Sequence, residues 1–177
     1  MKHRSKPFTL ALTLALSLGL MGSASAAGSK TASDFPDFEA TAWYAQAVTA
    51  AVDNGLLEGT DQGLLLPEDD LSRAEMAAMV DRAFGTYMDG DISQFTDVPQ
   101  DAWYYDEIAM AYHMGTYEGT GKRTMSPENT ITRQEVLTIL ARALQLDTEA
   151  YKDTDLSRFA DASQVADWAL PSVRAMV

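Results

Sequence analysis

Two arginines occupy the same position in two copies of a short motif, Ser-Arg-Ala-Glu at residues 72–75 and Thr-Arg-Gln-Glu at 132–135. A serine or threonine followed three residues later by glutamate has the spacing of a capping box, which predicts that Arg73 and Arg133 lie in the first turn of a helix. A guanidinium there can donate two parallel hydrogen bonds to a carboxylate, and the free amides and positive dipole end of a helix start also favour an anion. The alternative is that both arginines are solvated or paired with a nearby acid.

The motif is part of a longer pattern that occurs twice, 60 residues apart (95 − 35 = 60). Comparison of residues 35–84 with 95–144, position by position, gives 16 identities in 50. The recurring pairs include Phe35 and Phe95, Asp37 and Asp97, Trp43 and Trp103, Gly55 and Gly115, Glu58 and Glu118, and Pro67 and Pro127. A third copy begins at Phe159 and reaches Trp168 before the sequence ends at Val177. Self-similarity of this kind indicates a repeat architecture.

Each copy is predicted to fold as helix, loop, helix. In the first helix, apolar residues recur at three- and four-residue spacing from Trp43 to Val52, and Gly55 then ends the helix. The matching helix of the second copy is predicted from about 102 to 114, with a glycine stop at 115.

The loops and the second helices are predicted to supply the rest of the core. Leu65 and Met125 each lie two residues before a proline, and we expect them to pin the loops to the core. The capping boxes then begin the second helices. A single helix pair cannot bury its apolar faces alone, whereas several stacked copies can. The sequence therefore predicts an all-α protein of tandem helix-loop-helix repeats with an incomplete third repeat.

The chain divides into five segments. Residues 1–26 combine a basic start, an apolar run and small residues at a cleavage site, which is typical of a secretory signal peptide. Residues 27–34 are predicted to be a linker. The first repeat is predicted at 35–88, the second at 95–146 and the truncated third at 159–177. The polar residues 86–93 and 147–157 are predicted to be solvated connectors, because neither supplies the full ligand set of a calcium loop.

The composition narrows the class of partner. The formal net charge is −13, and removal of a signal peptide that carries three basic residues would make it 10 − 26 = −16. Such acidity argues against nucleic acid and anionic lipid as partners. The sequence contains no cysteine, so an exported form must be stabilised by burial alone. Beyond the signal peptide no segment is long and apolar enough to span a membrane.

No constellation in the sequence points to catalysis. The only histidine after the signal peptide is His113, which is predicted to be a surface or boundary residue of a helix. No glycine-rich phosphate loop, metal-ligand cluster or nucleophile elbow is found. We therefore expect no enzyme activity, no cofactor and no metal.

Three features occur together in both copies: a Phe-x-Asp opening, a tryptophan six residues after the aspartate, and the Ser/Thr-Arg-x-Glu helix start. In this combination nearly all of residues 35–177 resembles S-layer homology domains, in which the last motif is commonly Thr-Arg-Ala-Glu. Each motif alone is weak, but the whole set in order is specific.

The resemblance implies a non-covalent anchor for a secreted protein at the bacterial cell wall or S-layer. It implies a pseudo-threefold, three-pronged helical bundle whose grooves bind a secondary cell-wall polysaccharide, often one that carries pyruvate ketals. In the implied site Arg73 and Arg133 meet the acidic sugar. Four further residues of the same pattern complete the implied glycan-binding set: Trp43, Trp103, Asp37 and Asp97.

The residues themselves leave other roles open. Trp43 and Trp103 fit the core as well as a groove, because each lies on the apolar side of its predicted helix. Asp37 and Asp97 fit a helix entry or a fixed turn as well as a ligand contact.

The third copy departs from the pattern. Its aspartate-to-tryptophan spacing is seven rather than six (168 − 161 = 7), and it has no second helix. A missing prong is expected to expose apolar surface and to remove one or two grooves. The residues expected to be exposed are Trp168, Leu170, Val173 and Met176. Self-association or a longer parent chain would complete the repeat.

The sequence thus predicts an exported repeat protein that is attached to the cell envelope through carbohydrate. The competing interpretation is a protein–protein interaction or structural helical repeat of the envelope without glycan binding.

Overall fold

The computed structural model describes residues 30–85 and 87–177, so the predicted signal peptide lies outside the described residues. The helices are α1 (Ala45–Asp53), α2 (Arg73–Phe84), α3 (Tyr105–His113), α4 (Arg133–Ala143) and α5 (Leu170–Met176). Short 3-10 turns lie at Ala32–Asp34, Thr148–Tyr151 and Ala162–Gln164. The described residues contain no strand, which confirms the all-helical prediction. None of their helices is long and apolar enough to cross a membrane.

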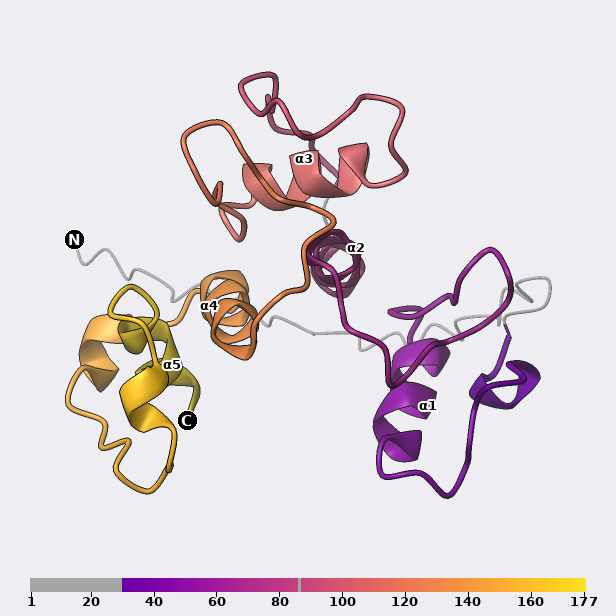
Figure 1. The fold of residues 1–177 in the computed structure, drawn as a ribbon, viewed down its shortest axis with the longest axis horizontal. Coiled ribbons are helices and arrows are strands. Elements are labelled where there is room, and N and C mark those ends of the chain that lie inside the picture. The colour runs from indigo at the N-terminus through magenta and orange to yellow at the C-terminus, as the bar shows by residue number, and fades with distance from the viewer. Residues whose placement is uncertain (1–29, 86) are drawn as a thin grey trace, which may run out of the picture.

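The second helix of each repeat begins at its predicted capping box. The Ser72 hydroxyl accepts from the Glu75 amide while the Glu75 carboxylate accepts from the Ser72 amide at 2.8 Å. Thr132 and Glu135 repeat this exchange at the start of α4. Figure 1 shows α2 and α4 nearly end-on near the middle of the molecule, with α1, α3 and α5 in three lobes around them.

The first helices end as predicted and begin later than predicted. Gly55 and Gly115 follow α1 and α3 with φ values of 69° and 70°, the left-handed conformation that ends a helix. However, α1 begins at Ala45, and residues 41–44 form turns. Trp43 therefore lies outside the amphipathic helix and is 87% exposed, so its predicted place on the apolar face is wrong. Its ring meets the buried Tyr44 edge-on at 5.7 Å.

The main core lies where the two repeats meet. Side chains of α2, α3 and α4 form its largest cluster, in which Val80, Ile108 and Ile139 are buried. Met125 is fully buried in this cluster, and Leu65 packs against a smaller cluster around Phe35. Both loop residues thus pin their loops to a core as predicted.

The third copy packs more tightly than expected. Val173 is only 7% exposed and forms a cluster with Leu156 and Ala169, against which Leu137 of α4 packs. The expectation that Val173 is exposed is therefore wrong, because α4 supplies the apolar surface that covers it. Trp168 is 56% exposed, as expected. Leu170 and Met176 are half-buried rather than exposed.

Both connectors that we predicted to be solvated, and the predicted linker before the first repeat, contribute residues to the core. In the connector between the repeats, Ile92 is buried and the Gly90 amide donates to the Ala109 carbonyl at 2.9 Å. In the predicted linker before the first repeat, Ala32 is buried beside Phe35. Leu156 holds the corresponding place in the third copy, three residues before Phe159. Each Phe-x-Asp opening is therefore preceded by a buried anchor three residues earlier.

Candidate functional site

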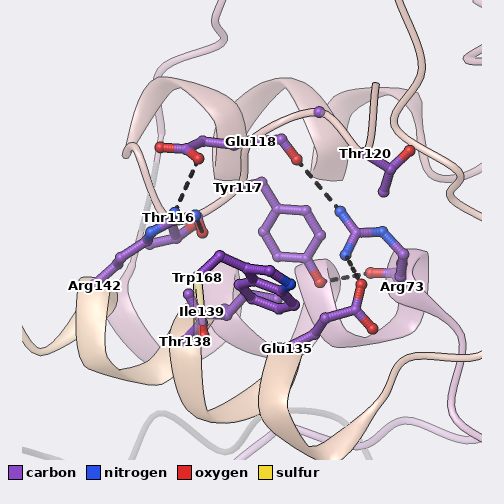
Figure 2. A pocket seen from close by; sticks show the side chains of 11 residues that line it. Arg73, Thr116, Tyr117, Glu118, Thr120, Glu135, Thr138, Ile139, Arg142 and Trp168 are labelled. Atoms are coloured by element: carbon purple, nitrogen blue, oxygen red, sulfur yellow. Dashed lines mark hydrogen bonds and ion pairs between the residues drawn. The ribbon is translucent and has the colours of Figure 1, made fainter. Parts of the chain in front are cut away.

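A pocket of about 420 Å³ lies where α2, the loop after α3, α4 and the third copy meet. We call it groove 1. Its lining includes Arg73, Thr116, Tyr117, Glu118, Thr120, Glu135, Arg142 and Trp168. In the view of Figure 2, Arg73 and Arg142 lie at opposite sides of the pocket, with the rings of Tyr117 and Trp168 between them.

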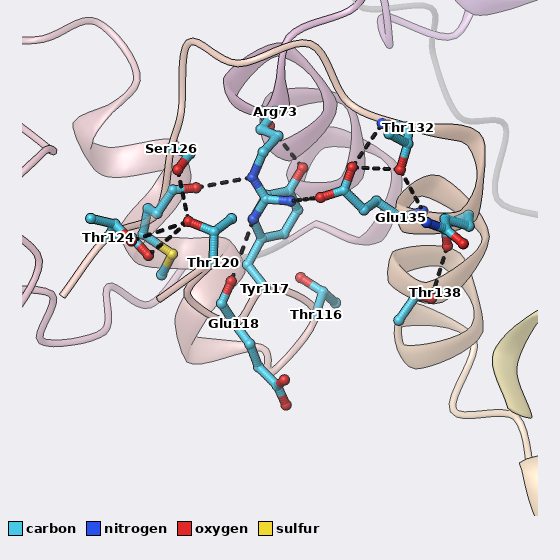
Figure 3. Close-up of polar contacts among 12 residues, drawn as sticks. Arg73, Thr116, Tyr117, Glu118, Thr120, Thr124, Ser126, Thr132, Glu135 and Thr138 are labelled. Carbon is cyan, nitrogen blue, oxygen red and sulfur yellow. Dashed lines mark hydrogen bonds and ion pairs between the residues drawn. The ribbon is translucent and has the colours of Figure 1, made fainter. Parts of the chain in front are cut away.

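Arg73 is held in a cradle built by the second repeat. Its Nε donates to the Met125 carbonyl at 2.9 Å, its Nη2 to the Glu118 carbonyl at 3.4 Å, and its Nη1 to Glu135 Oε1 at 3.2 Å. Figure 3 shows the bonds from this guanidinium to Glu118 and Glu135. Three of the five N–H groups that a guanidinium carries are thus engaged. Arg73 lies in a groove, yet it is 5% exposed and is also paired with an acid, as the alternative predicted.

Tyr117 forms the floor of the cradle. Its ring lies 5.1 Å from the carbon atom of the Arg73 guanidinium, and its hydroxyl donates to the Arg73 carbonyl at 2.7 Å. Burial raises the pKa of the Tyr117 hydroxyl, so the hydroxyl keeps its proton and remains a donor at neutral pH. The cradle therefore holds both the backbone and the side chain of Arg73.

Arg142 is a groove residue that our sequence analysis missed. Its Nη2 bonds Glu118 Oε2 at 2.9 Å and its Nη1 the Thr116 carbonyl at 3.5 Å. The sequence contains a signal for this residue, because Arg82 occupies the same position of the first repeat, 60 residues earlier (142 − 82 = 60). With Arg73 and Arg142 against Glu118 and Glu135, the side chains that line groove 1 carry a net charge of 2 − 2 = 0.

A second pocket, of about 540 Å³, repeats groove 1 one copy earlier. We call it groove 2. It is lined by the 57–61 loop, residues 65–66 and 69–71, Trp103, and four residues of α2: Glu75, Ala78, Met79 and Arg82. Arg82 bonds Glu58 at 3.0 Å and the Leu56 carbonyl at 3.3 Å. Arg142 makes the equivalent contacts in groove 1, with Glu118 and the Thr116 carbonyl. The acids of groove 2 are Glu58, Asp61, Asp69, Asp70 and Glu75, so its net charge is 1 − 5 = −4.

The three tryptophans have different environments. Trp168 lines groove 1, and Trp103, which is 62% exposed, lines groove 2. A core position for Trp103, the alternative that the sequence allowed, is therefore wrong. Trp43 is exposed and lines neither groove, although the sequence pattern placed it with Trp103.

The two aspartates of the Phe-x-Asp openings fix loops. Asp97 accepts from the Met125 amide at 2.9 Å and the Ser126 amide at 2.8 Å, and Asp37 makes the equivalent bonds to residues 65 and 66. Partial burial would raise the pKa of Asp37, but the two loop amides outweigh it and hold that pKa below its usual range. Neither aspartate lines groove 1 or groove 2, in agreement with the turn-fixing alternative.

Arg133 differs sharply from Arg73. It is exposed, lines neither groove, and its side chain makes no hydrogen bond or ion pair within the part of the chain that the structure describes. The first-turn amides of α2 are also unavailable to an anion, because the Arg73 amide donates to the Asn129 carbonyl at 3.0 Å and the Ala74 amide to the Pro127 carbonyl at 2.8 Å. The expected contribution of free helix amides at Arg73 is therefore wrong.

Potential metal ligands do not gather in the described residues. No group of three or more histidine, cysteine or acidic side chains there has an arrangement that could hold an ion. His113, the histidine we expected at a surface or boundary, is exposed at the end of α3.

Comparison with known proteins identifies one family, which matches two segments of the chain. The model of the S-layer homology domain matches residues 34–77 and 94–137. The Surface-layer 125 kDa protein of Lysinibacillus sphaericus is 39% identical over 140 residues, which cover 78% of this chain and 12% of that protein.

Other relatives include surface-layer proteins and enzymes. S-layer protein sap of Bacillus anthracis is 30% identical over 166 residues, 94% of this chain and 20% of that protein. Exoglucanase XynX of Acetivibrio thermocellus is 30% identical over 129 residues, 72% of this chain and 12% of that enzyme. The chain thus spans only a fifth or less of these proteins. Two family-model repeats, together with surface-layer relatives, show that the chain belongs to the S-layer homology domain family, whose members attach to the cell envelope.

Proposed function

We propose that this chain anchors an exported protein non-covalently to the bacterial cell wall by binding a secondary cell-wall polysaccharide in groove 1. The observation that carries the proposal is that two arginines and one exposed tryptophan line a single pocket between repeats. An aromatic ring can cover the apolar face of a sugar, while guanidinium groups recognise an acidic substituent. Family membership supports envelope attachment, and groove 1 supplies chemistry for the glycan.

The local charges favour an acidic sugar in groove 1 over groove 2. The lining of groove 1 is neutral, whereas that of groove 2 carries −4. A carboxylate such as that of a pyruvate ketal meets Arg142, whose side chain is 34% exposed, and the two uncommitted N–H groups of Arg73. It must compete there with Glu118 and Glu135. We expect binding to depend on short-range contacts with these donors, because the protein as a whole is acidic and repels an anionic glycan at long range.

The site residues of this proposal are Arg73, Arg142 and Trp168. Arg133 remains a predicted contact for a further groove, and Trp103 a contact in groove 2. We leave Asp37, Asp97 and Trp43 outside the ligand contacts, because the aspartates bind loop amides and Trp43 lines neither groove.

We further propose that the lobes around α2 and α4 follow a pseudo-threefold, three-pronged plan, in which a third helix would lie beside these two. The repeats themselves are proposed to be non-catalytic. Relatives that are enzymes support a role in anchoring other domains, since the matched segment is a small part of each.

The proposal is tested by sedimentation with bacterial wall sacculi, before and after chemical removal of the attached polysaccharide. We expect the protein to sediment with intact sacculi and to stay in the supernatant after the removal. Trp168→Ala should weaken sedimentation at least tenfold. Trp43→Ala removes an even more exposed indole, which lies outside both grooves, and should have no effect.

Two results would count against the proposal. Sedimentation that survives polysaccharide removal would favour binding to peptidoglycan or protein, which is the competing interpretation of a protein-interaction repeat. Equal losses in Trp168→Ala and Trp43→Ala would mean that groove 1 is not the binding site.

A further inference from the structure

Two carboxylates line groove 1, and Glu135 is the one that is firmly held. Its side chain is 23% exposed, and its Oε1 pairs with Arg73 at 3.2 Å. Its Oε2 accepts from the Thr132 amide at 2.8 Å and from the Thr132 hydroxyl at 2.6 Å. An anion that displaced Glu135 would break the capping box of α4 together with the link between the two repeats. Glu135 is therefore a fixed acid of groove 1.

The carboxylate of Glu118 is held by much less. Its side chain is 70% exposed, and among the described residues its carboxylate bonds one partner, Arg142 Nη2 at 2.9 Å. Exposed ion pairs of this kind stabilise a fold very little. Water hydrates the carboxylate once it leaves the arginine, so its release leaves no buried charge without a partner. Glu118 is thus the acid that a ligand can displace.

The backbone at position 118 stays in place while the side chain turns. The Glu118 carbonyl accepts from Arg73 Nη2 at 3.4 Å, and the Tyr117 amide donates to the Ala111 carbonyl at 3.1 Å. Rotation about the side-chain bonds of Glu118 therefore releases the carboxylate without moving the loop or the cradle that holds Arg73. Exposed side chains make such rotations within picoseconds to nanoseconds.

Arg142 remains positioned when Glu118 leaves it. Its Nη1 donates to the carbonyl of the buried Thr116 at 3.5 Å. Figure 2 shows Arg142 at the opposite side of groove 1 from Arg73, with the Trp168 ring between the two arginines. An acidic sugar in groove 1 can therefore reach the Nη2 atom to which Glu118 is bonded.

We infer that the Glu118 carboxylate is an internal stand-in for the acidic group of the glycan, and that binding exchanges one carboxylate for the other at Arg142. The inference rests on the proposed glycan binding in groove 1. Both carboxylates accept the same charge-assisted bond, so the exchange keeps the guanidinium paired. A small anion gains only the contact that Glu118 already supplies, whereas an acidic sugar also covers Trp168. Glu118 therefore lowers the affinity for anions in general and selects those that carry a sugar ring.

The equivalent pair of the first repeat has different surroundings. Arg82 and Glu58 bond at 3.0 Å in groove 2. An anion that displaced Glu58 would lie beside four further acids of that groove, which are Asp61, Asp69, Asp70 and Glu75. Repulsion between like charges opposes the exchange there. The neutral lining of groove 1 makes Arg142 the arginine at which the exchange takes place.

Calorimetric titration of purified wall polysaccharide into the full chain tests the exchange. Glu118→Gln keeps the shape of the side chain but removes its charge, which weakens the pair that the ligand must break. The substitution should tighten binding about threefold. The matched control is Glu149→Gln, which removes one charge from an exposed acid that lies 4.0 Å from Lys152 and outside both grooves. It should leave the affinity unchanged.

A second measurement follows the displaced side chain itself. The NMR resonance of the Glu118 carboxyl carbon is identified by its absence from Glu118→Gln. On saturation of the wild-type chain with polysaccharide, it should move toward its position in Arg142→Ala, where the ion pair cannot form. The corresponding resonance of Glu149 should stay in place.

Three results would overturn the inference: unchanged or weaker binding in Glu118→Gln, an equal gain in Glu149→Gln, or a Glu118 resonance that does not move at saturation. In each of these cases the wild-type chain still binds polysaccharide, so the glycan proposal stands. Absence of saturable binding to the wild-type chain would instead contradict the glycan proposal, and this inference with it.

Discussion

Glu135 joins the two repeats through its two carboxylate oxygens. Oε1 accepts from Arg73 of the first repeat at 3.2 Å, while Oε2 accepts from the Thr132 amide and closes the capping box of α4 at 2.8 Å. The arginine that the sequence motif presents for ligand binding is thus also a structural link. Arg73 is buried because the loop and α4 of the second repeat surround its side chain, whereas Arg133 is exposed.

The first prediction follows from this difference. Arg73→Ala should lower the free energy of unfolding by about 2–3 kcal/mol, because it leaves the Met125 carbonyl and Glu135 Oε1 without their donor. Arg133→Ala, at an exposed position, should change it by no more than about 0.5 kcal/mol. Urea unfolding followed by circular dichroism measures both. Similar costs for the two variants would show that the cradle does not stabilise the fold.

Asp97 carries the second prediction. Its carboxylate accepts from the Met125 and Ser126 amides, so Asp97→Ala leaves two loop amides unsatisfied. We expect a loss of about 2 kcal/mol in the free energy of unfolding. We also expect faster amide hydrogen exchange at residues 125 and 126. Unchanged exchange at these two amides would contradict the loop-fixing role.

The third prediction concerns pH. Asp81 on α2 is 4% exposed, and neither of its carboxylate oxygens has a hydrogen-bond partner in the described residues. Burial, and then the nearby charge of Glu107 on α3, raise the pKa of Asp81 to about 8. The positive charge of Arg82 opposes this shift. The buried Tyr117 is a further titratable group near Asp81.

The sign of the effect follows from proton binding. Between the usual aspartate pKa of 3.8 and about 8, the folded state holds a proton that the unfolded state has lost. This contribution to stability is complete below pH 3.8, falls as pH rises through this window, and levels off above 8. Urea midpoints at pH 5 and 8.5 should therefore differ in the wild-type chain. Asp81→Ala, which copies the residue at position 141 of the second repeat, should remove that part of the difference. An equal pH slope in the variant would contradict the assignment.

Gly59 gives the fourth prediction. It has a φ of 80°, and a β-carbon there would collide with the ring of Phe35. Gly55 has a φ of 69° but open space around it. Gly55→Ala should cost about 1 kcal/mol through backbone strain alone. Gly59→Ala should cost clearly more, and thermal melts of the two variants compare them. An equal cost would mean that the Phe35 ring moves aside freely.

Much of the local structure was predictable because it depends on local chemistry. The capping boxes at Ser72 and Thr132 and the stops at Gly55 and Gly115 each need only a few neighbouring residues. Met125 was predictable because the repeat places an apolar residue there in both loops.

Other features depend on contacts between repeats and were not predictable from local patterns. Trp43 fits the apolar periodicity of a helix, but turns delay the helix start and leave the ring exposed. Val173 is buried only because α4 offers an apolar surface. The burial of Arg73 requires a following loop, which Arg133 lacks within the described residues. Arg142 could have been found from the sequence, because Arg82 occupies the same position in the first repeat. An arginine that is kept at the same exposed position of both repeats indicates a shared role.

The central claim is that groove 1 binds an acidic wall glycan through Arg73, Arg142 and Trp168. Calorimetric titration of purified wall polysaccharide into the wild-type chain, Trp168→Ala and Trp43→Ala tests it most directly. We predict saturable binding that weakens at least tenfold, about 1.4 kcal/mol, in Trp168→Ala and stays unchanged in Trp43→Ala. Wild-type affinity in Trp168→Ala, or no saturable binding to the wild-type chain, would contradict the claim.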